Sequence, residues 1–188
     1  MALKPFSPLK YSYHLSYPKL TVIITSGTPE HPNAMAVSWH TYLSFNPPLY
    51  GVSISPKRYT CELIRQHGDF GVNFLPFELS EKVWLVGSYS GKQFNKIQKF
   101  DLEIMKASKI NAPILQQSLV ALECKVIKEV KTGDHIFFIG EIVYAWVQEN
   151  ILLNAQSGLL DTVKAKQVYY LGEGKFLTTD NSTVVEYE

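Results

Sequence analysis

Asn33-Ala-Met-Ala-Val-Ser-Trp39 says most about the fold of this 188-residue chain, together with Pro47-Pro-Leu-Tyr-Gly-Val-Ser-Ile-Ser-Pro-Lys-Arg-Tyr-Thr60. The two stretches predict two β-strands, the second of which ends in a polar turn that opens a helix. Small residues in the first strand leave room for a flat ring beside the backbone. A cationic turn at a helix start suits a phosphate group. The pattern therefore indicates a site for a flat, phosphorylated cofactor.

The turn carries the groups that hold a phosphate monoester. This anion has about two negative charges and is best bound by main-chain N–H groups, hydroxyls and cations. Arg58 can make bidentate contacts, whereas Lys57 acts as a point charge. A solvated turn in which Ser55 or Thr60 caps the helix is the alternative. The candidate phosphate ligands are Ser53, Ser55, Lys57, Arg58, Tyr59 and Thr60.

The strand at 33–39 alternates small residues, Ala34, Ala36 and Ser38, with larger ones. A flavin ring needs a flat apolar wall and hydrogen bonds to its pyrimidine edge, usually from main-chain groups. Flavin mononucleotide (FMN) is therefore the leading cofactor candidate, and an ordinary packed barrel strand is the alternative. Ser88-Tyr-Ser-Gly91 is a small-residue loop that could also contact a phosphate.

His135 is the acid–base candidate because it follows Asp134 at the tip of an expected hairpin. A neighbouring carboxylate can hold an imidazole in one tautomer. A turn Asp beside a solvated His is the alternative. We predict no metal site built by the protein, since the other histidines have no ligand spacing: His14, His31, His40 and His67.

Length and composition predict one domain over residues 1–188, with its core at about 15–177 and a lead-in at 4–18 that wraps the surface or a partner. A net charge of +1 argues against nucleic acid and membrane surfaces as partners. The two cysteines have no redox or metal spacing and are expected to be reduced and half-buried. No signal peptide or membrane-length apolar run is visible, so we expect a cytoplasmic protein.

Hydrophobic patterning predicts a mainly β protein with short helices, in which hairpins build a β-barrel with helical decoration. Gly68 should end the first helix, and Gly133 should lie in a hairpin turn at 131–134. Residues 94–100 are ambiguous. Strands are expected at 20–26, 33–39, 49–54, 69–74, 119–130, 136–147, 168–171 and 175–177, and helices at 61–66 and 76–87.

Four ordered segments resemble the flavin reductase-like family of FMN-binding split barrels, most closely its flavoredoxin group. The resemblance covers roughly residues 15 to 177. It implies a six-stranded Greek-key split barrel that forms a homodimer, with FMN near the subunit interface. The segments are Leu20–Thr25 leading into Asn33–Trp39, Asn46–Pro48 with Ser53–Thr60, Gly68–Asn73, and Gly133–Glu141.

The resemblance also implies roles for matching residues. Ser53, Ile54 and Ser55 would continue the wall beside the flavin ring, and His135 lies in an element near the flavin. Arg58, Tyr59 and Thr60 would bind the ribityl phosphate with Ser88, Ser90 and Gly91. The isoalloxazine itself would be lined by Asn33, Ala34, Met35, Ala36, Val37, Ser38 and Trp39.

Three functions stay open. The first is a reductase in which NADH or NADPH reduces bound FMN and a small molecule or protein receives the electrons. No Gly-x-Gly-x-x-Gly fingerprint is present, so the nicotinamide would dock transiently. The second is a flavoredoxin-like electron carrier without its own NAD(P)H activity. The third is a barrel that binds another small molecule or only its own copy.

Overall fold

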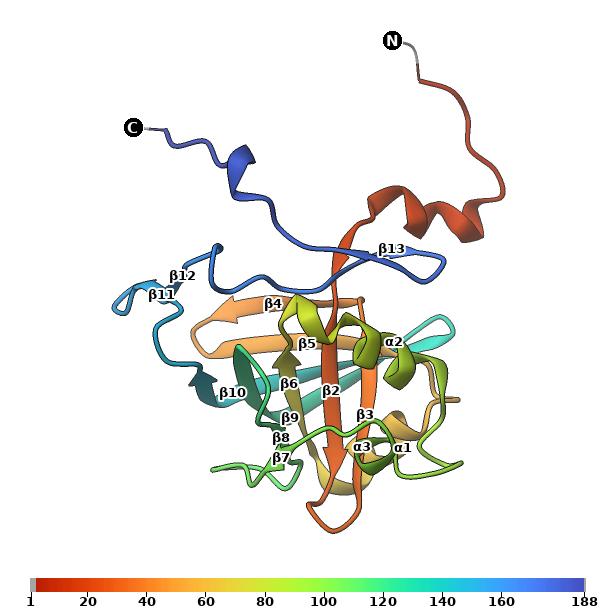
Figure 1. The fold of residues 1–188 in the computed structure, drawn as a ribbon. Helices are drawn as coiled ribbons and strands as arrows, with labels where there is room; N and C mark the ends of the chain where they lie inside the picture. Colours follow the sequence, from red (N-terminus) through yellow and green to blue (C-terminus); the bar gives the residue numbers. More distant parts are fainter. Residues whose placement is uncertain (1–2, 188) are drawn as a thin grey trace.

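A curved antiparallel sheet of seven strands forms the centre of the computed structural model, which describes residues 3–187 (Figure 1). The strand order is β3-β2-β6-β9-β10-β5-β4, so β3 lies at one edge. The strands are β2 (Val22–Gly27), β3 (Pro32–Val37), β4 (His40–Phe45), β5 (Pro48–Ile54), β6 (Asp69–Phe74), β9 (Val120–Thr132) and β10 (His135–Val147).

The two ends of this sheet approach each other, although β3 and β4 are not paired in the strand order. Consecutive strands β3 and β4 lie at opposite ends of the strand order and are joined through Ser38 and Trp39. The N–H of Ser53 in β5 donates to the carbonyl oxygen of Trp39 at 2.9 Å. The sheet therefore curls into the predicted split barrel, and β4 makes it one strand larger than the six that the resemblance implied.

Within residues 3–187, three α-helices lie on the β2–β3 side of the barrel: α1 (Tyr59–His67), α2 (Ser80–Ser88) and α3 (Lys96–Lys99). α2 and α3 pack against β3, and α1 packs against β2. Short 3₁₀ helices are η1 (Leu9–Ser16), η2 (Phe77–Leu79) and η3 (Asn181–Thr183). Both termini project from the same side of the barrel (Figure 1). Across residues 3–187, no helix has the length and apolar character that crossing a membrane requires.

Smaller sheets complete the fold. β1 (Lys19–Leu20), β13 (Tyr169–Gly172) and β14 (Lys175–Leu177) form a three-stranded sheet beside the barrel. Two further pairs are β7 (Ile104–Met105) with β8 (Ile114–Leu115), and β11 (Leu152–Asn154) with β12 (Leu159–Leu160).

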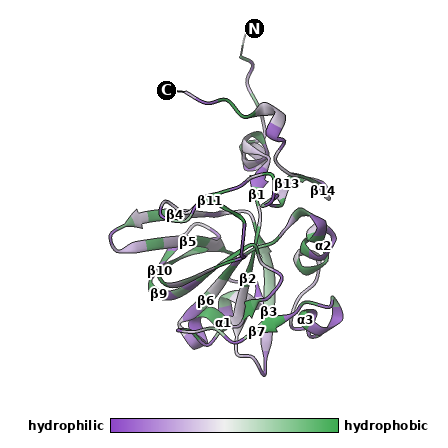
Figure 2. Ribbon diagram, turned by 60° about the vertical axis from the view of Figure 1, so that its left-hand side comes forward, coloured by the Kyte–Doolittle hydropathy of each residue, from purple (hydrophilic) through white to green (hydrophobic). Residues whose placement is uncertain are grey.

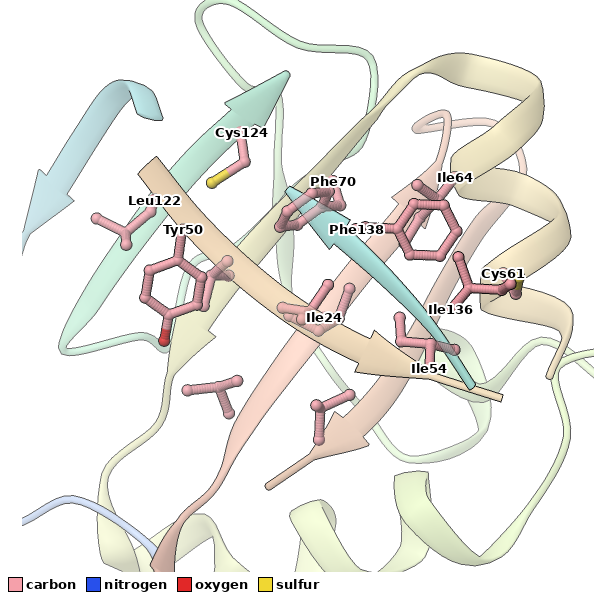
Figure 3. Close-up of a cluster of buried hydrophobic side chains, with 14 of the residues drawn as sticks. Ile24, Tyr50, Ile54, Cys61, Ile64, Phe70, Leu122, Cys124, Ile136 and Phe138 are labelled. Carbon is pink, nitrogen blue, oxygen red and sulfur yellow. The ribbon is translucent and has the colours of Figure 1, made fainter. Parts of the chain in front are cut away.

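The core has two layers that share β2. Val22 and Ile24 pack inside the barrel, whereas Ile23 faces α2 and α3. This double burial explains why the three consecutive residues Val22, Ile23 and Ile24 are all apolar. Figure 2 shows hydrophobic segments along the barrel strands. In the barrel interior, Cys61 and Ile64 of α1 point toward residues of β10 (Figure 3).

The sequence predicted the C-terminal end of α1 correctly but not its N-cap. Gly68 ends α1 with φ 73°, and its N–H donates to Ile64 O at 2.8 Å, as predicted. Neither Ser55 nor Thr60 is the N-cap. Arg58 holds that position without a side-chain cap bond, because Thr60 lies inside the helix and points to a neighbouring strand.

Other corrections concern strands and cysteines. The predicted strand at 20–26 is divided near Thr21, whose N–H donates to Val168 O at 2.9 Å, so β1 joins a different sheet from β2. β4 was not predicted. Cys61 and Cys124 are free but fully buried rather than half-buried, since both belong to the barrel core.

The remaining strand and helix predictions hold with shifted ends. Residues 76–87 form η2 and α2, and the ambiguous stretch at 94–100 contains α3. The predicted hairpin of β9 and β10 turns at Gly133 and Asp134, because Lys131 and Thr132 still pair with β10.

Candidate functional site

β3 is the floor of a row of cavities on the outside of the barrel. Met35 lines three of them, with volumes of about 190, 470 and 660 Å³. Ala36 lines a fourth, of about 270 Å³, between α2 and the β13–β14 hairpin. Because they share residues, these cavities form one continuous groove along the strand.

The cavity of about 190 Å³ is here called the cation pocket. Its wall is built where α1 begins, where α2 ends and where β3 starts. Three of its residues are cations and none is a carboxylate. The polar and small residues of its wall are Asn33, Ala36, Lys57, Arg58, Tyr59, Thr60, Gly87, Tyr89, Ser90, Gly91 and Lys96.

Lys96 is a buried cation in this pocket, with 3% of its surface exposed. Its ammonium donates to Val86 O and Tyr89 O, both at 2.9 Å. Burial, and secondarily the charge of Arg58, lower the pKa of Lys96 to about 8. Within residues 3–187 it has no carboxylate partner. Since buried charges in proteins are normally paired, an anionic ligand would complete this site.

Asn33 contributes a second buried group to this pocket, an amide oxygen that lacks a hydrogen-bond partner in the described chain. Its Nδ2 donates to Ser26 Oγ at 3.1 Å and Thr60 Oγ1 at 2.9 Å, which fixes the side chain between β2 and α1. Its Oδ1 is buried and accepts no hydrogen bond from the described chain. Gly91 packs against this oxygen so closely that any Cβ there would collide with it. A donor on a ligand would satisfy the oxygen.

The loop at 88–92 is fastened to α1. Lys92 Nζ lies 2.6 Å from Glu62 Oε2 and 5.5 Å from the centre of the Tyr59 ring. Ser90 and Gly91 line the cation pocket, and their contact with a phosphate stays a prediction. Ser88 does not line it, because its hydroxyl donates to Trp84 O at 2.8 Å and it lines the cavity beside the β13–β14 hairpin.

The cavity of about 660 Å³ is here called the aromatic pocket. Trp39 lies between two rings, with centroids 5.1 Å from His135 and 5.5 Å from Tyr13. Tyr17 and Tyr170 meet edge to face at 6.0 Å. Such walls favour a planar ligand. Lys10, Arg58, Ser53 and Asp134 also line this pocket.

His135 adjoins Asp134 as expected. Its Nδ1 is 2.7 Å from Asp134 Oδ1, and this hydrogen bond lowers the pKa of the carboxyl. The imidazole lines both the aromatic pocket and the adjacent cavity of about 470 Å³. It is thus held at the mouth of the groove.

Most other predicted residues gather on the same groove. Ser55, Lys57 and Arg58 line the cavity of about 470 Å³. Ala34 and Ile54 are fully buried in the two core layers, so any contact with a ligand must come from their main chain. The aromatic pocket contains Met35, Ala36, Val37, Ser38, Trp39 and Ser53.

Sequence reasoning missed Lys96, Tyr13, Tyr17 and Tyr170. Lys96 sits among polar residues and has the pattern of a solvated helix face. Tyr170 lies far from Tyr13 and Tyr17 in the sequence, and no local signal indicated that they meet. In the described part of the chain, no three His, Cys, Asp or Glu side chains are placed to hold a metal ion.

Two proteins of Archaeoglobus fulgidus are similar to this chain in sequence. An uncharacterized protein of Archaeoglobus fulgidus is 39% identical over 166 residues, covering 88% of this chain and 90% of the relative. A ferric-chelate reductase (NAD(P)H) of the same organism is 32% identical over 106 residues, covering 56% of this chain and 62% of that protein.

Two solved structures share the fold. An FMN-binding protein from Thermus thermophilus with bound 1-cyclohex-2-enone has a TM-score of 0.85 and 28% identity, covering 99% of both chains. A flavoredoxin from Methanosarcina acetivorans has a TM-score of 0.85 and 25% identity, covering 98% of this chain and 95% of that one. The model of the flavin reductase like domain matches residues 14–162, and this chain therefore belongs to that family.

Proposed function

We propose that this protein is an FMN-binding oxidoreductase in which NADH or NADPH delivers electrons that pass on to free flavin, a ferric chelate or another acceptor. The observation that carries the proposal is the cation pocket. It places Lys57, Arg58 and a buried Lys96, which has no carboxylate partner within residues 3–187, around one small cavity at a helix start. This is the chemistry that a phosphate dianion needs.

The described residues fit FMN along the whole groove. The phosphate would lie in the cation pocket, near the N–H of Gly91 and the hydroxyl of Thr60. Asn33 Oδ1, which lacks a donor in the described chain, would accept from a ribityl hydroxyl. The ring would lie along β3, against the small side chains of Ala36 and Ser38. Similarity to FMN-binding and flavoredoxin structures supports this assignment.

When bound, FMN supplies the redox chemistry, accepting a hydride and passing electrons on. The protein's part is binding, orientation and access. Arg58 and Lys96 hold the anionic end, and the aromatic pocket admits a planar partner next to the ring. His135 is positioned by Asp134 to hold or move a proton at Nε2 at the mouth of the groove.

The alternative is a flavoredoxin-like electron carrier without NAD(P)H activity, which the 25% identity to a flavoredoxin favours. We also propose a homodimer. Large apolar side chains lie exposed on β4, where Phe45 is 99% exposed, and along η1. A second copy of the chain would cover them.

The visible spectrum of the purified protein tests the proposal, recorded before and after anaerobic addition of NADH or NADPH. A flavin spectrum that bleaches quickly supports the reductase and identifies the donor. A flavin spectrum that persists favours the carrier. No flavin spectrum after incubation with FMN would overturn both. Ferric chelate reduction by the bleached protein then tests one acceptor, with heat-denatured protein as the control.

A further inference from the structure

The N-terminal segment at residues 9–17 contributes side chains to the aromatic pocket. Its helix η1 has no buried residue. The segment is nevertheless anchored, because β1 follows it directly and pairs Lys19 with Tyr170 and Leu20 with Tyr169. The pairing fixes where the chain enters the pocket, so the tyrosines just before it have defined positions.

Tyr13 and Tyr17 are the two aromatic residues of this segment that line the pocket. Tyr13 meets Trp39 edge to face at 5.5 Å, and Tyr17 meets Tyr170 at 6.0 Å. The two tyrosines also contact each other, with centroids 5.9 Å apart. Partial burial raises the pKa of Tyr17.

These rings lie away from the cation pocket, which neither of them lines. They face the part of the groove that holds Trp39 and His135. A cofactor whose phosphate occupies the cation pocket and whose ring lies along β3 would fill only part of the groove. The rest of the aromatic pocket, lined by Tyr13, Tyr17 and Tyr170, would remain free for the molecule that exchanges electrons with the cofactor.

We propose that Tyr13 and Tyr17 are specificity-determining residues that make this exchange faster with small planar molecules of about one ring than with wider acceptors such as free flavin. Aromatic walls stack well on flat rings, and a tyrosine has few rotatable bonds with which to move aside. Wider molecules would have to displace the two rings and would therefore react more slowly. This inference rests on the proposed function, because it takes the groove as the site of a flavin.

The test compares a one-ring and a three-ring acceptor, 1,4-benzoquinone and 9,10-phenanthrenequinone. The protein is loaded with FMN and reduced anaerobically with dithionite, so that no nicotinamide is needed. Each quinone then takes up two electrons and two protons from the reduced flavin and becomes the hydroquinone. The rate constant for the three-ring quinone is divided by that for the one-ring quinone, so that effects common to both acceptors cancel.

In the double variant Tyr13→Ala/Tyr17→Ala this ratio should rise about tenfold, the scale on which pocket shape discriminates between ligands. Tyr13→Trp should lower it. Tyr11→Ala is the matched control, since Tyr11 lies on the same exposed helix and does not line the pocket. Its ratio should equal that of the unmodified protein.

A second readout needs no turnover. p-Hydroxybenzaldehyde is titrated into the oxidised, flavin-loaded protein, and its binding is followed as a shift of the flavin absorption band. The double variant should bind it about tenfold more weakly, since the wall on which it stacks is gone. If the protein binds flavin but ratio and affinity match those of the Tyr11→Ala control, the inference is wrong and the proposed function stands. If it binds no flavin, both are wrong.

Discussion

Gly91 lies directly against the amide oxygen of Asn33, with no room for a side chain between the loop at 88–92 and β3. Gly91 has no positive φ, so alanine would be allowed by the backbone and excluded only by this contact. Gly91→Ala should push the loop away from the cation pocket. We expect FMN to bind about tenfold more weakly, a loss of about 1.4 kcal/mol.

Fluorescence quenching of FMN by the apoprotein measures this affinity. Ser88→Ala is the control, because Ser88 belongs to the same loop but does not line the cation pocket. Equal affinities for Gly91→Ala and the control would show that the loop does not form part of the phosphate site.

Arg58→Ala should weaken FMN retention. Arg58 lines the cation pocket and has no carboxylate partner in the part of the chain that the structure describes. Its charge-assisted hydrogen bonds to a phosphate would contribute about 1.5–3 kcal/mol, so Kd should rise roughly 10- to 100-fold. The quantity to measure is flavin content after purification, followed by titration with FMN.

Arg65→Ala is the matched control for Arg58. Arg65 lies on the same helix but pairs with Glu129 at 2.9 Å, away from the groove. An Arg58→Ala protein with the flavin occupancy and affinity of the Arg65→Ala protein would remove Arg58 from the site.

FMN affinity should depend on pH through Lys96. Burial lowers the pKa of Lys96 to about 8, so the free protein loses this charge as pH rises through that value. The phosphate is already a dianion there. At higher pH the neutral Lys96 must therefore take up a proton before it can pair with the phosphate, and this uptake costs binding free energy. FMN should bind more weakly at pH 9 than at pH 7.

Riboflavin, which has no phosphate, provides the comparison. Its affinity should change less between these pH values than that of FMN. In Lys96→Met the difference between the two ligands should disappear. A decline of equal size for FMN and riboflavin would assign the pH effect to the ring or its surroundings instead.

His40 should make stability fall in mild acid. Its Nε2 donates to Leu20 O at 2.9 Å, and its Nδ1 accepts from the Tyr50 hydroxyl at 2.5 Å. Burial lowers the pKa of His40 below its usual 6.5. The neutral form is thus favoured by folding. Its contribution is fully present above about pH 6.5 and is lost as pH falls through the folded-state pKa.

Urea unfolding at pH 7.5 and at pH 5 measures this loss. His40→Gln should be less stable at pH 7.5 and should show a smaller difference between the two pH values. His31→Gln is the control, since His31 lies in an exposed turn. A difference that is unchanged in His40→Gln would place the acid sensitivity at other groups.

Local patterns predicted what depends on neighbours in sequence. Gly68 ends a helix because its own conformation is left-handed, and Gly133 turns a hairpin for the same reason. The β-branched residues of β2 predicted a strand without knowledge of its partners. β4 was not predicted, because its large apolar side chains do not form the buried face that marks a strand in a sequence pattern. Tyr42, Leu43 and Phe45 are all exposed.

The site was predictable only where its groups are contiguous. Lys57, Arg58 and Thr60 form one turn, and β3 is one strand. Lys96 joins them because the chain returns after α2 and tucks the ammonium beneath Val86 and Tyr89. Such burial of a charge is set by tertiary packing, and the sequence around Lys96 does not reveal it.

The position of β3 at the edge of the sheet has a consequence for how this site can change during evolution. An edge strand keeps one row of main-chain N–H and C=O groups outside the ladder. A ring bound along β3 can be recognised by these groups, which are the same for every amino acid. Mutations at Met35 or Ala36 would then reshape the wall without erasing the recognition. A lineage could diversify its substrates while keeping its cofactor, because strand order rather than side-chain identity preserves the binding edge.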